Sequence, residues 1–102
     1  MDKQKALNLL GMAYRARMII NGYDSVMDAI TKGKAKIVLI ANDASEKTIE
    51  AFDKKCFYYK VDMNVVFNSL ELSKAIGKGL VKVLAISDEG FTKSLKKLLS
   101  EV

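Results

Sequence analysis

Apolar residues along the chain alternate between helical spacing and short continuous runs. Leu7 and Leu10 recur at helical spacing within an apolar stripe that predicts a first helix over residues 3–15. The apolar segment at 18–20 then predicts a brief strand, because the turn-forming Asn-Gly pair that follows would end it. The chain therefore begins with a helix followed by a short extended segment.

A second helix is expected after this turn. The side chains of Asp24 and Ser25 can cap its first turn, and the Lys-Gly pair at 32–33 is typical of a helix end, since glycine readily adopts a left-handed conformation. The following segment, 36–41, is almost continuously apolar and rich in β-branched residues. This pattern predicts a strand that is covered on both faces.

The second half of the chain continues the alternation of helices and strands. We expect a turn and cap at 42–45, a helix to about residue 55, strands at 56–61 and 80–86, short helical pieces at 64–70 and 73–76, a loop at 77–79 and a final helix capped at 87–88. The alternation, in a chain of 102 residues, predicts a single α/β domain over 1–102, with a mixed or parallel sheet between helices.

Composition narrows the chemistry open to this domain. Lys and Arg number 17 against 12 Asp and Glu, and the net charge of +5 makes nucleic acid the first partner to consider and an anionic membrane the second. There is no histidine and one cysteine, Cys56, so we expect no imidazole catalysis, metal site, cofactor or internal disulfide. Asp43 and Asp88 stand at expected helix starts, where capping explains them. We therefore expect no enzyme.

The chain shows no signal-peptide pattern, and its apolar runs are far too short to cross a bilayer. A helix with a broad basic face and exposed aromatic residues, as membrane-surface binding requires, is also not expected. These patterns predict a cytoplasmic protein without a membrane partner, and we expect it to be a monomer.

Several motifs, taken in their joint order and spacing, resemble one known family. They are Leu10–Ala16, Ile20–Gly22, Gly33–Ala41, Asn42–Ser45, Ala75–Gly79 before Val81–Val83, and Asp88–Phe91. This order is similar to the ribosomal L-seven-Ae / L-thirty-e superfamily, and most of all to its short YlxQ-type bacterial members, over nearly the whole chain. The resemblance implies a three-layer α/β/α sandwich with a four-stranded mixed sheet. It also implies binding to kink-turn RNA, a bulged duplex that bends sharply beside tandem G·A pairs, in a ribosome- or translation-associated ribonucleoprotein.

The resemblance places the first RNA contact around Asn21 and Gly22. Gly22 matches the glycine that opens the family's second helix and lets the backbone approach RNA, whereas on the sequence alone it could simply make a turn. Asp24, Ser25 and Asp28 match positions where many RNA-binding members have Asn, Glu and Lys. Asp24 could accept a guanine proton but would repel phosphate, and Asp28 replaces a usual cation.

Basic residues near this segment are candidates for phosphate contacts. Arg17 is the preferred one because it adjoins the Gly22 segment in the sequence, and Lys34 is a further candidate. A lysine on a protein surface is more often simply solvated. The sequence leaves this alternative open.

A second contact is expected at the loop before the last strand. Leu80 and Val81 match a short apolar stretch that family members bring against unstacked nucleotides, while Lys78 and Lys82 could reach phosphates. Gly79 would let the loop backbone lie close to RNA. Alternation along a strand turns at least one of Leu80 and Val81 toward the core, so only one of the pair is expected to touch RNA.

The aromatic residues are interpreted as structural. A strand at 56–61 would turn one of Tyr58 and Tyr59 into the core, and Phe57 is also assigned to the core.

An alternative function remains, in which the domain has lost kink-turn binding and serves as a protein–protein interaction module. A ribosomal or translation-factor protein would be the expected partner in that case.

Overall fold

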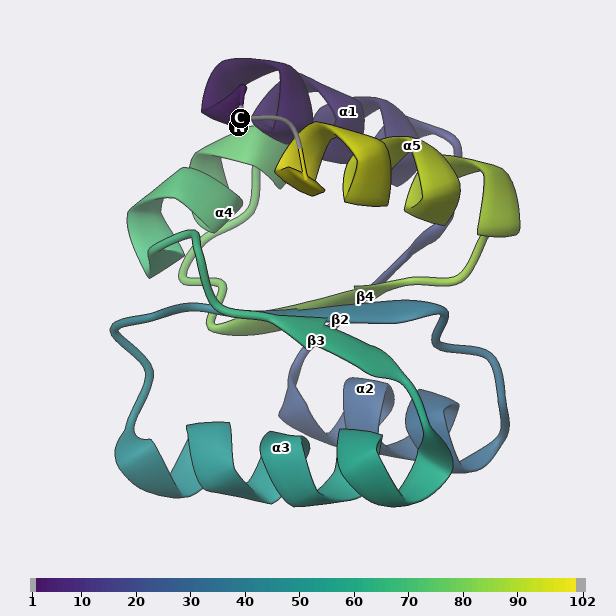
Figure 1. Cartoon of the computed structure of the whole chain (residues 1–102). Coiled ribbons are helices and arrows are strands. Elements are labelled where there is room, and N and C mark those ends of the chain that lie inside the picture. The colour runs from purple at the N-terminus through teal and green to yellow at the C-terminus, as the bar shows by residue number, and fades with distance from the viewer. Residues whose placement is uncertain (1, 101–102) are drawn as a thin grey trace.

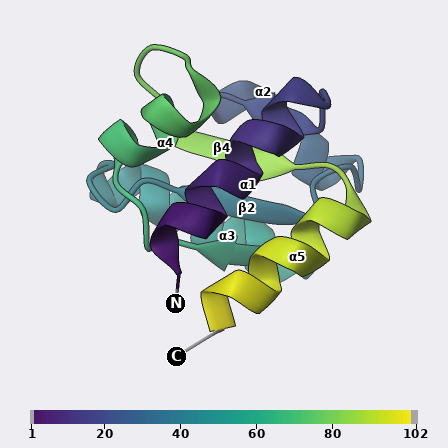
Figure 2. The same cartoon turned by 90° about the horizontal axis from the view of Figure 1, so that it is seen from above.

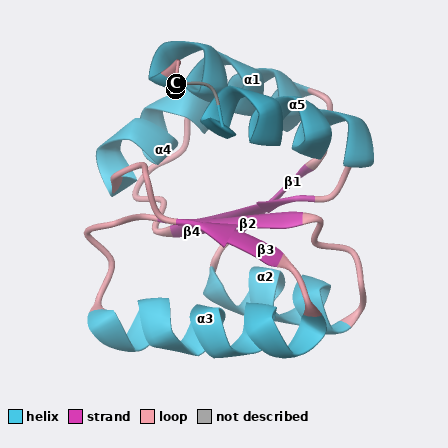
Figure 3. Ribbon diagram, in the orientation of Figure 1, coloured by secondary structure: helices cyan, strands magenta, loops and turns pink. Residues whose placement is uncertain are grey.

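The protein is a three-layer sandwich with helices on both faces of one sheet. In a computed structural model, which describes residues 2–100, the elements follow the order α1 (Lys3–Arg15), β1 (Ile19–Asn21), α2 (Tyr23–Thr31), β2 (Ile37–Ile40), α3 (Glu46–Tyr59), β3 (Asp62–Asn64), α4 (Ser69–Ile76), β4 (Val83–Ile86) and α5 (Glu89–Ser100). Helices α1, α4 and α5 cover one face, and α2 and α3 cover the other (Figure 1, Figure 3). The α/β/α sandwich expected from the sequence is thus confirmed.

The sheet has the strand order β1-β4-β2-β3 and is mixed, because β2 and β3 pair in parallel whereas β4 is antiparallel to both of its neighbours. The pairing aligns Ile19, Ile86, Ile37 and Asp62 in one row across all four strands. We call the end of the sheet beside this row the distal end. The opposite, proximal end is where β1 and β2 finish and β4 begins.

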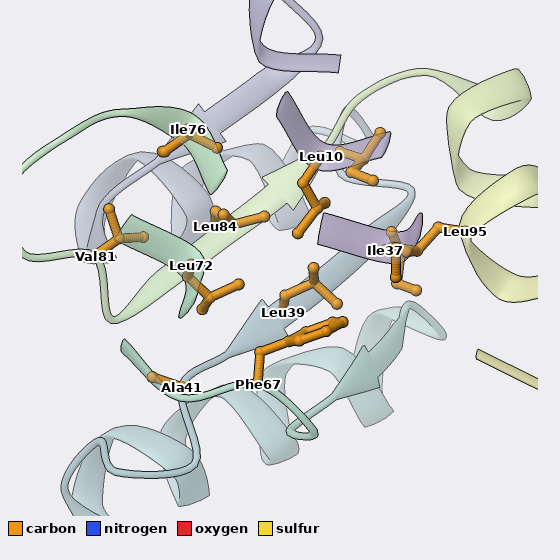
Figure 4. Close-up of a cluster of buried hydrophobic side chains, with 12 residues drawn as sticks. Leu10, Ile37, Leu39, Ala41, Phe67, Leu72, Ile76, Val81, Leu84 and Leu95 are labelled. Carbon is orange, nitrogen blue, oxygen red and sulfur yellow. The ribbon is translucent and has the colours of Figure 1, made fainter. Parts of the chain in front are cut away.

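Each face of the sheet carries its own buried cluster. Above the sheet, on the face covered by α1, α4 and α5, Leu10 of α1 and Leu72 of α4 pack with Leu39 of β2 and Leu84 of β4 (Figure 4). Below the sheet, Phe52 of α3 belongs to the cluster that includes strand and α2 residues. Both central strands, β2 and β4, are buried at every position, as the continuously apolar pattern predicts for strands covered on two faces.

Helix α1 lies between α4 and α5 when the molecule is viewed from above the sheet (Figure 2). At Gly11 an added Cβ would lie 2.9 Å from the carbonyl oxygen of Ala75, so glycine is what allows α1 to approach α4 this closely. Helix α4 is held at its start by a reciprocal capping box between Asn68 and Glu71. The layer above the sheet is therefore fixed by backbone contact as well as by the apolar core.

Several helix ends follow the sequence-based expectations. Ser45 caps α3 by accepting from the Thr48 amide, and Asp88 caps α5 by accepting from the Phe91 amide at 2.9 Å. Gly33 has φ +73° and follows the end of α2. The expected caps of α2, however, are wrong: its N-cap is Gly22, so Asp24 lies inside the first turn.

The predicted strand at 56–61 is also wrong, because α3 continues to Tyr59. Phe52 and Cys56 are four residues apart and both buried, so they lie on one face of a helix. The strand prediction had instead expected alternate residues of 56–61 to be buried. Tertiary burial here outweighs the preference of aromatic residues for strands. The actual strand, β3, spans three residues, and the helix expected at 64–70 begins only at Ser69.

The last strand is shorter than predicted, since β4 begins at Val83 and not at residue 80. Residues 80–82 therefore belong to the loop that joins α4 to β4.

Within residues 2–100, no helix combines the length and apolar character needed to span a membrane.

Candidate nucleic-acid interface

A groove at the proximal end brings together three segments that are far apart in the sequence. It has a volume of about 370 Å³ and is lined by Asn21, Gly22, Tyr23, Thr48, Leu80, Lys82 and Val83. These residues come from the end of β1 and the start of α2, from the first turn of α3, and from the loop that enters β4. They meet because β1 and β2 finish where the antiparallel β4 begins.

Gly22 is the bend between β1 and α2. Its φ of +105° and ψ of 154° lie in a region that is essentially restricted to glycine, and nothing lies within 4 Å of where a Cβ would stand. The Gly22 amide donates to the carbonyl of Val83 at 3.2 Å, which ties the bend to β4. As an N-cap without a side chain, Gly22 leaves the first amides of α2 without a side-chain acceptor. The groove therefore has a bare backbone wall with the partial positive charge of a helix N-terminus.

The opposite wall is formed by the loop before β4. Leu80 is 77% exposed, whereas Val81 is 1% exposed and its amide donates to the hydroxyl of Ser73 at 2.8 Å. Of Leu80 and Val81, which the sequence analysis proposed as apolar RNA contacts, only Leu80 presents its side chain outward. Gly77, in the left-handed conformation, ends α4 and starts this loop.

Two lysines of the loop are placed differently. Lys82 lines the groove, and its ammonium lies 3.4 Å from the carbonyl oxygen of Asp43. Lys78 lies over the ring of Tyr14, with its ammonium 5.7 Å from the ring centre. Together with Gly79, Lys78 lines a second depression that Leu80 shares. The loop thus carries cations on both sides of the exposed leucine.

Asp43 holds the turn beside the groove in place. Its carboxylate accepts from the amide of Ser69 at 2.8 Å and from the Ser69 hydroxyl at 2.6 Å. These two hydrogen bonds lower the pKa of Asp43. The carboxylate therefore joins the β2–α3 turn to the start of α4, a structural role that goes beyond the local cap inferred from the sequence.

The polar residues of α2 lie on its exposed face. Asp24 and Ser25 are in the first turn next to Gly22, where a negative charge is favourable to the helix dipole. Asp28 is one turn further and forms an ion pair of 3.0 Å with Lys32. Its charge is thus partly offset by a lysine that directly follows the same helix.

The structure does not bring Arg17 and Lys34 to the groove. The amide of Ser87, just beyond β4, donates to the carbonyl of Met18, and the amide of Lys36 donates to the carbonyl of Ile86, so both Arg17 and Lys34 lie toward the distal end. The expectation that Arg17 adjoins Gly22 is therefore wrong in space, because β1 carries the chain across the sheet between them. Arg17 lines another depression, with Tyr14, Arg15 and Ile19.

Sequence reasoning missed three residues that line the groove, Tyr23, Thr48 and Val83. Tyr23 is 45% exposed and its ring makes an edge contact with Phe52 at a centroid distance of 5.0 Å. An aromatic residue directly after a turn glycine could have drawn attention to Tyr23. Thr48 carried no such signal, since only the approach of α3 to β4 places it here.

Within the described residues, no group of three or more cysteine or acidic side chains is placed to hold a metal ion. Cys56 is buried in the lower cluster, and burial raises the pKa of its thiol to about 11. The chemistry of the groove is therefore that of backbone amides, the exposed side chain of Leu80, one lysine (Lys82) and the polar groups of Asn21, Tyr23 and Thr48.

Comparison with known proteins identifies relatives over almost the entire chain. The model of the ribosomal protein L7Ae/L30e/S12e/Gadd45 family matches residues 4–96. The RNA-binding protein YlxQ of Enterococcus faecium is 43% identical, over 96% of this chain and 94% of the relative, and YlxQ of Bacillus subtilis is 42% identical, over 89% and 91%. The solved structure of a Giardia lamblia 15.5kD RNA binding protein superposes with a TM-score of 0.83 at 18% identity, over 97% and 86%, which supports the fold.

Proposed function

We propose that this chain, which belongs to the ribosomal protein L7Ae/L30e/S12e/Gadd45 family, binds RNA and recognises a kink-turn or a related sharp bend through the proximal groove. The observation that carries the proposal is the meeting of Gly22 with Leu80 and Lys82 in one groove. The relatives described as RNA-binding proteins support RNA as the ligand. In this proposal the described fold acts as a single RNA-binding domain.

The shape of the groove favours a bent RNA over a regular duplex. An A-form helix displays its base edges in a wide, shallow minor groove and keeps its bases stacked. A sharp bend instead exposes base edges and unstacked nucleotides beside crowded phosphates. The bare backbone at Gly22 can approach the bent strand, while the exposed Leu80 can pack against an unstacked base and Lys82 can neutralise phosphate.

The acidic residues of α2 define how the RNA would be read. Asp24 stands next to the amides that open α2, where an ionised carboxylate accepts hydrogen bonds from the amino and imino groups of guanine. Asp28 is paired with Lys32, so this position adds less repulsion toward phosphate than an isolated carboxylate would. In this proposal Asp24 and Ser25 contact bases, and phosphate contacts come from Lys78 and Lys82 of the facing loop.

We extend the proposal to the cellular setting that the family description suggests. A role with ribosomal RNA or another translation-associated RNA, in the cytoplasm, agrees with the name of the family and with the net charge of +5. The proposal includes no catalytic step. A ribosomal or translation-factor protein is a further partner that such a setting would supply.

The test is a titration with a kink-turn RNA and with the same RNA after its tandem G·A pairs are changed to Watson–Crick pairs. The change removes the bend but keeps the charge, so tight binding to the kink-turn alone supports the proposal. Leu80→Ala is the matching protein variant, because a side chain that is 77% exposed contributes little to stability. We expect it to weaken kink-turn binding by about tenfold, the loss of one apolar contact to an unstacked base.

A protein–protein interaction module is the second candidate function. The exposed Asp24 and Asp28 favour it, because both carboxylates stand on the helix that would face phosphates. Equal, weak and salt-sensitive binding to both RNAs would count for this candidate. That result would reduce RNA binding to the attraction between the net positive charge and any polyanion.

A further inference from the structure

The last turn of α3 exposes three consecutive aromatic residues at the distal end. Phe57 is 87% exposed, Tyr58 77% and Tyr59 39%. The sequence assigned Phe57 to the core and one of the tyrosines to the inner face of a strand, and the structure overturns both assignments. The helix instead turns Phe52 and Cys56 inward, so the aromatic rings face outward.

The tyrosine rings are held in place by contacts with one another and with a lysine. Tyr58 and Tyr59 make an edge contact, with ring centroids 5.0 Å apart and planes at 73°. The ammonium of Lys55 lies 5.2 Å from the centre of the Tyr59 ring. These contacts limit the motion of the tyrosines and leave the face of Phe57 open.

Lysines flank these rings. Lys54 and Lys60 flank them on α3 and at its C-cap, and neither forms an ion pair within residues 2–100. Of the acidic neighbours, Asp62 is paired with Lys96, whereas Asp53 and Glu50, one turn before Lys54, are in no ion pair within residues 2–100. The lysines also offset the partial negative charge of the helix C-terminus.

More basic residues face the same end of the molecule. Lys34 follows the end of α2, and α2 runs in the same direction as α3 below the sheet, so both helices finish at the distal end (Figure 1). Ala35 and Cys56 belong to the same buried cluster and α2 packs against α3, so the chain after α2 lies on the same side of the sheet as the last turn of α3. The distal end therefore combines open aromatic rings with lysines that form no ion pair in the described part of the chain.

We infer that Phe57 and Tyr58, with Lys54 and Lys60, form a second nucleic-acid contact that takes single-stranded RNA. Exposed aromatic rings stack on unpaired bases, and flanking cations neutralise the phosphates between them. A protein partner of apolar surface would leave these cations without counter-charges, so the local charge favours a polyanion. The inference goes beyond the proposed function but rests on it in taking RNA as the ligand.

The position of the contact indicates which part of an RNA would reach it. Thr48 in the groove and Phe57 are nine residues apart on α3, or about 13 Å along the helix axis and about half a turn around it, so a strand between them would also pass round the helix. A strand that leaves a structured RNA in the groove could therefore follow α3 to the distal end within a few nucleotides. The second contact would bind the flank of the RNA while the groove binds its folded part.

A tryptophan reporter tests the stacking directly. The chain has no tryptophan, so Phe57→Trp introduces a single tryptophan, which can be excited apart from the four tyrosines, at an exposed position where the fold is not disturbed. The probes are a kink-turn RNA with a blunt end, the same RNA with a single-stranded tail of about ten uridines, and the tail alone. We expect quenching by the tailed RNA and by the tail alone, and none by the blunt RNA.

The affinity measurement uses alanine and glutamine variants. We expect Phe57→Ala and Tyr58→Ala each to reduce the tail-dependent gain in affinity by at least about fivefold, the lower limit for loss of one stacked base. Lys54→Gln should lower the salt dependence of tail binding. Lys93→Gln should leave it unchanged, since Lys93 is an exposed lysine of α5 that likewise has no ion-pair partner among residues 2–100. Blunt kink-turn affinity should be the same in all of these variants.

Two results would overturn the inference. One is a tail that adds no affinity and does not quench the tryptophan fluorescence of the Phe57→Trp variant. The other is a loss of tail binding in Lys93→Gln as large as in Lys54→Gln, which would show attraction by overall charge. Blunt kink-turn RNA tests the proposed function separately, since its binding does not involve the distal end.

Discussion

Replacement of Gly22 by alanine should destabilise the fold although the site has room for a methyl group. Nothing lies within 4 Å of the added Cβ, so no steric clash with a neighbour contributes. The cost comes from the backbone, because φ +105° and ψ 154° lie in a region that side chains with a Cβ disfavour. Such strain typically costs about 1–3 kcal/mol.

Urea denaturation measures this cost. For a small domain the free energy of unfolding falls by about 1–3 kcal/mol per molar urea, so the midpoint of Gly22→Ala should be lower by roughly 1 M. Gly79→Ala is the matched control, because Gly79 also lies in a loop with open space around it but does not have a positive φ. Its midpoint should stay close to that of the unchanged protein.

The same variant should also weaken RNA binding. The backbone can relieve the strain by rotating the peptide units at the start of α2, which moves the amides that face the groove. Unfolding of Gly22→Ala at the same urea concentration as Gly79→Ala would contradict the predicted loss of stability. In that case the bend would not require a glycine conformation.

Three further predictions concern titratable groups. Asp28→Lys should strengthen RNA binding and steepen its salt dependence, since it removes a carboxylate and releases Lys32 from its ion pair; unchanged binding would place α2 away from phosphate. Cys56, with a pKa of about 11, should react with a thiol reagent at neutral pH only after unfolding, and rapid labelling of the folded protein would contradict its burial. Folding lowers the pKa of Asp43 from its ordinary value of 3.8, so the ionised carboxylate should stabilise the fold at pH values above 3.8, and this stability should be lost as the pH falls through the lowered pKa. In urea denaturation at a series of pH values, Asp43→Asn should therefore lose less stability in acid than the unchanged protein.

The local features of this protein follow from patterns among neighbouring residues. The first helix was predicted at 3–15 and is observed at Lys3–Arg15, because its apolar spacing and its boundaries are both local signals. The apolar run at 36–41 indicated a strand buried on both faces, which is β2, and the strand expected at 80–86 is observed as the shorter β4. Capping at Ser45 and the glycine after α2 likewise depend on a few neighbouring residues.

Features that depend on contacts between distant segments could not be predicted from local patterns. The chain around Arg17 is close to Gly22 in sequence, but β1 separates the two along the sheet, whereas Leu80 is distant in sequence and shares the groove with Gly22. Packing of Phe52 and Cys56 also kept residues 56–59 helical, which exposed Phe57. Local propensity carries no information about these contacts, since burial against distant segments exceeds the small preferences of single residues for helix or strand.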